Sequence, residues 1–205
     1  MKAIKKARST CRPPTQLRAR QTVEAILDAV IRILKREGFE AVTTNRIADV
    51  GGVSIGSVYQ YFPDKRAIFV ALHERHVQEI DRIVQRTLVQ NASSSLDRLM
   101  TSMIEAMIDA HTTDPELHQL LLAEVPHRGD GTKDFAVRMH GAFLLAISSR
   151  ADELKKNRDP EKLAFVVTHM VESLSHGAVF RRPPGLSLTQ AKAEIVRAVL
   201  AFLHS

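Results

Sequence analysis

The residues best suited to specific binding chemistry lie between Ser54 and Tyr61, in the sequence SIGSVYQY. On a helix whose Val58 points inward, the outward residues are hydroxyl, amide and small apolar side chains without charge. Such groups can pair with the base edges that the major groove of DNA exposes. The stretch therefore predicts a helix that enters the major groove, and its outward set is Ser54, Ile55, Ser57, Tyr59, Gln60 and Tyr61.

Residues 43–65, TTNRIADVGGVSIGSVYQYFPDK, have the pattern of a helix-turn-helix that would position this face. Thr43 or Thr44 can cap a first short helix, and Ser54 can cap the second. Gly52 permits the left-handed backbone of the turn, which a side chain would resist. Ala48 is small enough for two helices to cross closely. The remaining apolar residues, Ile47, Val53 and Val58, are expected to pack this unit together.

The rest of the chain shows helical periodicity and no convincing strand. A first amphipathic helix is predicted from about residue 15 to 37, and a long helix follows the break at Pro63-Asp64. After a polar turn at 91–95, five more helices are predicted at about 96–111, 115–125, 133–156, 160–180 and 188–204. The last begins with Ser187 and Gln190 at capping-box spacing. The sequence thus predicts an all-α fold with about nine helices.

The basic character of the chain is concentrated at its beginning. The net charge is +6, but residues 1–20 alone carry +7 and no acid, so the remainder sums to −1. We expect residues 1–14 to be a disordered basic arm, which either follows DNA phosphates and the minor groove or is a solvated tail. Arg18 and Arg20 are the best placed for DNA, because they lie on or beside the first helix. We expect a contribution to the positive electrostatic field, or simply to solubility, from Arg32, Lys35, Arg36 and Arg46.

Cysteine content and hydropathy indicate a cytoplasmic protein. A single cysteine, Cys11, allows no intrachain disulfide and suits a reducing compartment. No apolar run approaches the roughly 18–20 residues of a membrane span, and no apolar segment follows the basic start as in a secretory signal. A transit peptide is also basic, but this arm runs directly into a helix. We therefore expect no membrane partner.

About residues 20–70 resemble the TetR family of bacterial repressors. The match runs in order through Glu37-Gly38-Phe39, Thr43-Thr44, Ile47-Ala48, Gly52-Val53-Ser54, Gly56, Tyr59, Tyr61-Phe62 and Lys65. One departure is Gly51, where the family usually has alanine. A second glycine is expected to loosen the turn, at a cost of about 1 kcal/mol or less.

The resemblance implies which residues contact DNA. Thr44, Tyr61 and Lys65 would hold phosphate, and Gly56 would let the backbone approach the groove. Gln60 is suited to adenine, and Ile55 to a thymine methyl. Two other interpretations stay open: Tyr59 packs partly against the protein, or the whole unit is a helical hairpin without DNA contact. The predicted DNA-binding set is Thr43, Thr44, Ser54, Ile55, Gly56, Ser57, Tyr59, Gln60, Tyr61, Lys65, Arg18 and Arg20.

The resemblance also implies three parts: the arm at 1–14, a DNA-binding domain at 15–66, and an effector-binding and dimerisation domain at 67–205. Family members commonly hold an apolar ligand between their central helices and form homodimers through the last two. Methionines tolerate varied ligand shapes, although a methionine stripe is also ordinary core and any one histidine can face solvent. The predicted pocket is Met100, Met103, Ile104, Met107, His111, Leu121, Glu124, His140, Phe143, Ile147, Val166, His169 and Met170, with Phe165 beside it.

No metal site, cofactor or catalytic centre is predicted. His73 and His76 are three residues apart and His169 and His176 seven, but neither pair has a matching cluster at ligand spacing. Phosphate loops, nucleophile elbows and paired acid–base carboxylates are missing from the sequence. The expected function is a ligand-responsive repressor that binds a near-palindromic operator in double-stranded DNA as a homodimer and is released by a small, largely apolar molecule. A ligand-independent DNA-binding adaptor and a helical enzyme remain the alternatives, and a cavity in the body would argue against the adaptor.

Overall fold

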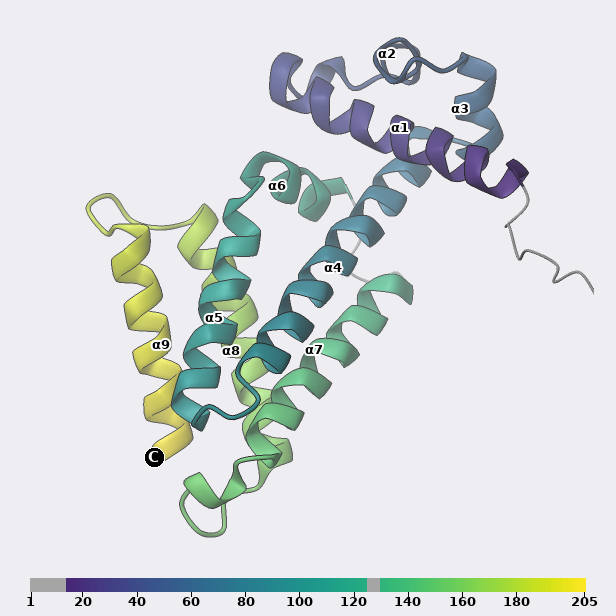
Figure 1. The fold of residues 1–205 in the computed structure, drawn as a ribbon. Coiled ribbons are helices and arrows are strands. Elements are labelled where there is room, and N and C mark those ends of the chain that lie inside the picture. Colours follow the sequence, from purple (N-terminus) through teal and green to yellow (C-terminus); the bar gives the residue numbers. More distant parts are fainter. Residues whose placement is uncertain (1–13, 125–129) are drawn as a thin grey trace, which may run out of the picture. The chain divides into compact units, whose positions relative to one another are not determined.

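The computed structural model describes residues 14–124 and 130–205, and within them it contains nine α-helices, two short 3-10 helices and no strand (Figure 1). The predicted all-α fold with about nine helices is therefore confirmed. The chain divides into a first compact unit that ends at Ile68 and a second, Phe69–Ser205. The predicted boundary after residue 66 lies two residues from this division.

The first unit consists of α1 (Pro14–Glu37), η1 (Phe39–Ala41), α2 (Thr44–Gly51) and α3 (Ile55–Tyr61). The inward stripe of α1, with Ile26, Val30 and Ile33, packs with Ile47 and Val58, and all of these side chains are fully buried. Helix α1 starts at Pro14, the last residue of the arm predicted at 1–14, and thus one residue earlier than predicted. Proline suits the first helical position since its missing N–H has no partner there. The rest of that arm lies outside the described residues.

The second unit contains most of α4 (Lys65–Gln90), then α5 (Leu96–Thr112), α6 (Pro115–Glu124), α7 (Asp130–Ser148), η2 (Ala151–Glu153), α8 (Pro160–Phe180) and α9 (Leu188–His204). Helix α8 packs against α5, α7 and α9 around a continuous apolar core. Asp159 caps α8, and Ser187 with Gln190 forms the predicted capping box of α9. The ends of these two helices follow from their capping residues.

Helix α7 ends earlier than predicted: it stops at Ser148 instead of continuing to about residue 156. The cause is Arg150, whose buried guanidinium turns toward the α4–α5 connection. Its Nε donates to Ser94 O at 2.7 Å, and its Nη2 donates to Asn91 O and Ala92 O at 2.9 Å each. Glu153 Oε2 accepts the N–H of Leu96, at the start of α5, at 2.8 Å. Arg150 and Glu153 together form what we call the α7–α8 brace.

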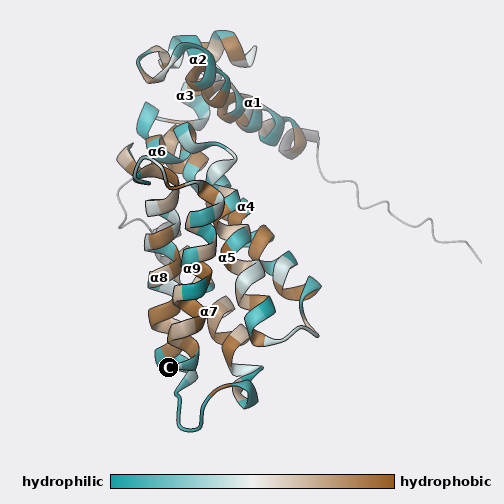
Figure 2. Cartoon of the chain, turned by 90° about the vertical axis from the view of Figure 1, so that its left-hand side faces the viewer, coloured by the Kyte–Doolittle hydropathy of each residue, from teal (hydrophilic) through white to brown (hydrophobic). Residues whose placement is uncertain are grey.

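Helix α8 is apolar over most of its length, as Figure 2 shows. It is the one described helix that is long and apolar enough to cross a membrane, with a mean hydropathy of 1.3 over a window of which 39% is buried. The expectation was that no apolar run approaches 18–20 residues, and α8 meets this criterion only as an average, because its many apolar residues outweigh interruptions such as His169 and Glu172. The core helix of a soluble protein meets the same criterion, and α8 does pack in the core of the second unit.

Candidate nucleic-acid interface and effector cavity

The turn between α2 and α3 has the geometry that its glycine predicts. Gly52 adopts φ 66° and ψ 30°, the left-handed region, and its N–H bonds to the carbonyls of Ala48 and Asp49. Gly51, the last residue of α2, lies so close to α1 that an added Cβ would be 3.3 Å from Ala25 O. Gly51, where the family usually has alanine, therefore lies at a point where α2 approaches α1 closely. The expected loosening of the turn is a separate effect.

Both short helices carry the predicted caps. Thr43 Oγ1 accepts the N–H of Arg46 at 3.2 Å, and Ser54 Oγ accepts the N–H of Ser57 at 3.0 Å. Satisfying these N–H groups matters here because a helix of only two turns has few internal hydrogen bonds. The caps fix where α3 begins, and hence which of its residues point outward.

Helix α3 buries Val58 and turns its other side outward. Ile55 is 39% exposed and Tyr59 is 54% exposed, while Gly56 and Gln60 are also exposed and Ser57 and Tyr61 are half-buried. The Tyr59 hydroxyl lies 3.2 Å from Thr44 Oγ1, which connects α3 to the first residue of α2. Tyr59 thus combines a bond to the protein with a largely exposed ring. The face that the sequence singled out is on the surface of its unit.

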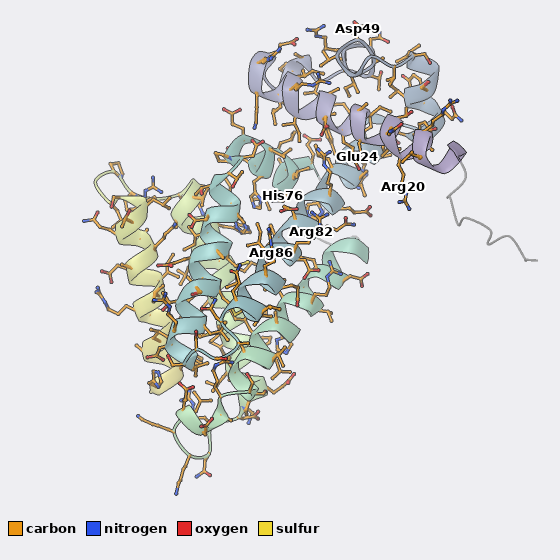
Figure 3. All side chains as sticks on the ribbon, viewed as in Figure 1. Arg20, Glu24, Asp49, His76, Arg82 and Arg86 are labelled. Carbon is orange, nitrogen blue, oxygen red and sulfur yellow. The ribbon has the colours of Figure 1, made fainter. Side chains whose placement is uncertain are left out.

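The basic residues of the first unit fall into two groups. Arg46 makes a bidentate ion pair with Glu37, with N···O distances of 2.9 and 2.8 Å, and this hydrogen bonding lowers the pKa of Glu37. Arg32 donates to Val50 O at 2.9 Å. These two arginines have structural partners, whereas Arg18 and Arg20 are exposed on α1, where Figure 3 labels Arg20. The role of Arg18 and Arg20 in holding phosphate stays a prediction.

Lys65 is the first residue of α4, and its ammonium lies 4.6 Å from the centre of the Phe39 ring. Asp64 Oδ1 accepts the N–H of Ala67 at 2.8 Å, which caps this helix as predicted. A ring beneath the ammonium limits the positions that the lysine side chain can adopt. Lys65 is therefore a pre-positioned cation at a helix N-terminus, an arrangement suited to phosphate.

Among the residues that the structure describes, two cavities of the second unit overlap only partly with the predicted pocket. One has a volume of about 830 Å³ and is lined by Met107, Phe143 and His169 among the predicted residues. The other, of about 730 Å³, is lined by His140, Val166 and His169, together with Phe165. Lining residues that were not predicted from the sequence include Phe135, Met139, His176, Phe180 and Arg181, whereas Glu172 was considered as a polar pocket residue and does line this cavity.

Most of the other predicted pocket residues are closed core. Met100, Met103, Ile104 and Ile147 are fully buried, and Leu121 is nearly so, but none of them lines either cavity. Glu124 and Met170 are half-buried and also outside both linings. The methionine stripe of α5 is thus mainly ordinary packing, and the cavity opens between α7 and α8 instead. Periodicity alone could not reveal this, because a packed apolar stripe and a cavity-lining one have the same spacing of apolar residues.

A group of histidines is the feature that the sequence argument missed most completely. His76, His111, His118 and His176 come from α4, α5, α6 and α8 and meet in the second unit. Burial lowers the pKa of His118 to about 2 and that of His76 to about 4, with the neighbouring imidazoles adding to the effect. Burial also lowers the pKa of His111. His76, His111 and His118 are therefore neutral imidazoles near pH 7.

A capped helix-turn-helix with an exposed, uncharged second helix, followed by a helical unit with cavities, defines the class of two-part DNA-binding regulators. Two family models match the chain. The model described as "Bacterial regulatory proteins, tetR family" matches residues 26–72, and "Tetracyclin repressor-like, C-terminal domain" matches residues 95–203. The chain belongs to the TetR family of bacterial transcriptional regulators, which are DNA-binding proteins.

The individual relatives resemble this chain over only part of its length. The nucleoid occlusion factor SlmA of Actinobacillus pleuropneumoniae is 34% identical over 97 residues, which are 47% of this chain and 44% of that protein. The transcriptional repressor KstR of Mycobacterium tuberculosis is 35% identical over 74 residues, 36% of this chain and 34% of that protein. The match thus spans less than half the length of these relatives. A solved structure of a Rhodococcus protein of unknown function shares the fold, with a TM-score of 0.72 at 15% identity over 90% of this chain and 96% of that one.

Proposed function

We propose that this protein is a ligand-responsive transcriptional repressor of the bacterial cytoplasm, which binds a near-palindromic operator as a homodimer. The observation that carries this proposal is the exposed, uncharged face of α3 on a capped helix-turn-helix. In a dimer, two copies of α3 would enter successive major grooves, so the operator mirrors the twofold symmetry of the protein. No role as an enzyme is part of this proposal.

The effector is proposed to be a small, largely apolar molecule in the cavity of about 830 Å³. This volume lies within the range of small-molecule sites, and the lining combines apolar walls with a few polar groups. Met107, Phe143 and Phe180 supply apolar surface, while Glu172 and Arg181 can orient a polar end. The cavity favours a ligand-responsive repressor over a ligand-independent adaptor. One relative is named a nucleoid occlusion factor, so the experiment below also tests the adaptor function.

DNA binding is tested by removing the pre-positioned cation. Lys65→Ala should weaken binding to all DNA sequences alike and reduce the slope of log affinity against log salt by about 1 per protomer. Fluorescence anisotropy with a selected operator and with random DNA, at several salt concentrations, measures both quantities. The matched control is Lys162→Ala, which removes the same charge from an exposed position on α8 in the other unit. Equal affinities and slopes for the two variants would exclude the proposed docking. A selected operator that no apolar compound releases would favour the adaptor.

Dimerisation is proposed to use α8 and α9. Val166, Met170 and Leu174 form a stripe on α8 that its own unit covers only in part, and Leu174 is 37% exposed. Gly177 continues the stripe, and an added Cβ would meet no atom within 4 Å. On α9, Val196 and Leu200 are likewise half-buried. Such incompletely covered apolar faces suit packing against a second copy of the same helices.

Leu174→Glu should raise the dimer dissociation constant at least about tenfold, because a carboxylate would be buried in an apolar contact. Sedimentation equilibrium measures the monomer–dimer distribution. Leu145→Glu is the control, because Leu145 is 60% exposed on α7 and receives the same change outside the proposed face. If both variants dimerise as the parent protein does, α8 is not the dimer contact.

A further inference from the structure

Three imidazoles meet closely enough to share one ion. One ring nitrogen from each of His111, His118 and His176 lies within 4.8 Å of the others. The His118 and His176 Nε2 atoms are 3.1 Å apart. Two ligands of a tetrahedral zinc ion with Zn–N bonds of 2.0–2.1 Å are about 3.3 Å apart. One pair is therefore already near ligand spacing, and a shift of the third imidazole by about 1–1.5 Å would complete the set.

Hydrogen bonds orient two of these rings as metal ligands require. His111 Nδ1 lies 2.5 Å from Met107 O, and a carbonyl only accepts, so Nδ1 carries the proton and Nε2 keeps the lone pair. His118 Nδ1 lies 2.7 Å from His76 Nε2, which can hold the proton of His118 on Nδ1 in the same way. Metal-binding histidines typically donate their second N–H to such an outer partner.

We propose that His111, His118 and His176 bind a divalent transition-metal ion of the zinc type, with His76 as the outer partner that positions His118. Three neutral nitrogen ligands with an incomplete fourth position are typical of accessible zinc sites. Of the three histidines, His176 also lines the cavity of about 830 Å³, so we place the fourth position on the side of that cavity. Its occupant would be water or an oxygen atom of the effector.

The geometry that supports this assignment is the convergence of three ring nitrogens within 4.8 Å of one another, together with the hydrogen bond that leaves Nε2 of His111 available to a metal ion. The earlier expectation of no metal site considered spacing along the chain, and ligands from three different helices leave no such spacing. The competing explanation is a hydrogen-bonded imidazole cluster that never binds an ion, and the experiment below distinguishes the two.

The test uses the full-length protein, stripped with a chelator and then titrated with Zn²⁺ against a competing chromophoric chelator. We expect one ion per protomer, no comparable binding of Mg²⁺, and the visible absorption of four-coordinate Co²⁺ when cobalt replaces zinc. His176→Gln should weaken Zn²⁺ binding at least about 100-fold, as expected when one of three ligands is lost. His176 is half-buried, so this variant is expected to fold, and circular dichroism verifies that.

The matched control is His204→Gln, a half-buried histidine near the end of α9 that belongs neither to the cluster nor to either cavity lining, and this variant should bind Zn²⁺ like the parent protein. His111→Gln provides a second ligand variant and should lose binding as His176→Gln does. Absence of a saturable Zn²⁺ site, or equal affinity in the parent and both ligand variants, would overturn the proposal and leave a purely structural cluster.

A regulatory role of this site rests on the proposed function. His76 lies on α4, the helix that begins with Lys65, so an ion at the cluster would act on a helix shared with the first unit. We expect Zn²⁺ to change operator affinity at least about fivefold in the parent protein and not in His176→Gln. Zn²⁺ binding without a change in operator affinity would exclude the regulatory role but not the metal site. Metal binding is measured without DNA, so a failure of the repressor proposal can be distinguished from the absence of the metal site and from the absence of regulation.

Discussion

Gly56→Leu is expected to lower operator affinity at least about 100-fold while the protein remains folded, the loss equivalent to one or two base contacts. Gly56 is the second residue of α3, it is exposed, and an added Cβ would meet only Ser54 Oγ at 3.7 Å. The protein itself therefore has room for a side chain. The start of a recognition helix lies closest to the bases, so a leucine there would occupy space that the DNA needs.

The measurement is anisotropy with a selected operator, accompanied by thermal denaturation. Leucine has a higher helix propensity than glycine, so the melting temperature should not fall. Gly141→Leu is the control, since Gly141 is exposed on α7 and its Cβ direction is also open. Unchanged operator affinity in folded Gly56→Leu would mean that α3 does not approach DNA as proposed.

Arg150→Ala is expected to give the largest loss of stability, about 3 kcal/mol or more. The guanidinium is 8% exposed and donates to the carbonyls of Asn91, Ala92 and Ser94. Removing it leaves these acceptors without their donor in a partly buried turn, and it also removes the packing of the side chain. For a chain of this size the melting temperature should fall by about 6–12 °C.

Circular dichroism melting of the full chain measures this effect. Arg150→Lys keeps the charge, but a single ammonium cannot donate to three carbonyls as the forked guanidinium does. This variant should therefore recover only part of the stability that Arg150→Ala loses. Arg158→Ala is the control, because Arg158 also donates to a carbonyl, Phe202 O at 3.0 Å, but lies closer to solvent. A change of under about 1 kcal/mol is expected there. Equal effects of the two alanine substitutions would show that the brace contributes no special stability.

Local features were the most predictable from sequence. The caps at Thr43, Ser54 and Ser187 and the left-handed Gly52 depend on interactions within a few residues, and each was predicted correctly. The inward position of Val58 follows from the helical period and is also as expected. Short-range chemistry of this kind does not need knowledge of the tertiary structure.

Long-range features were not predictable in the same way. Apolar residues beyond Ser148 continue the periodicity of α7, but Arg150 ends the helix by binding carbonyls more than 50 residues earlier in the chain. The histidine cluster combines positions from four helices, so no spacing along the chain marks it. The apolar stripe of α5 predicted buried residues correctly, but whether they pack or line a cavity depends on their neighbours on α7 and α8.

The α7–α8 brace also ties one end of α4 to the rest of the second unit. Arg150 binds carbonyls of the Asn91–Ser95 turn, and Glu153 accepts the N–H of Leu96 directly after it. His76 lies roughly 21 Å from Gln90 along this helix, at about 1.5 Å per residue. We therefore expect a ligand or ion bound near His76 to displace the braced end of α4 less than the helix around His76.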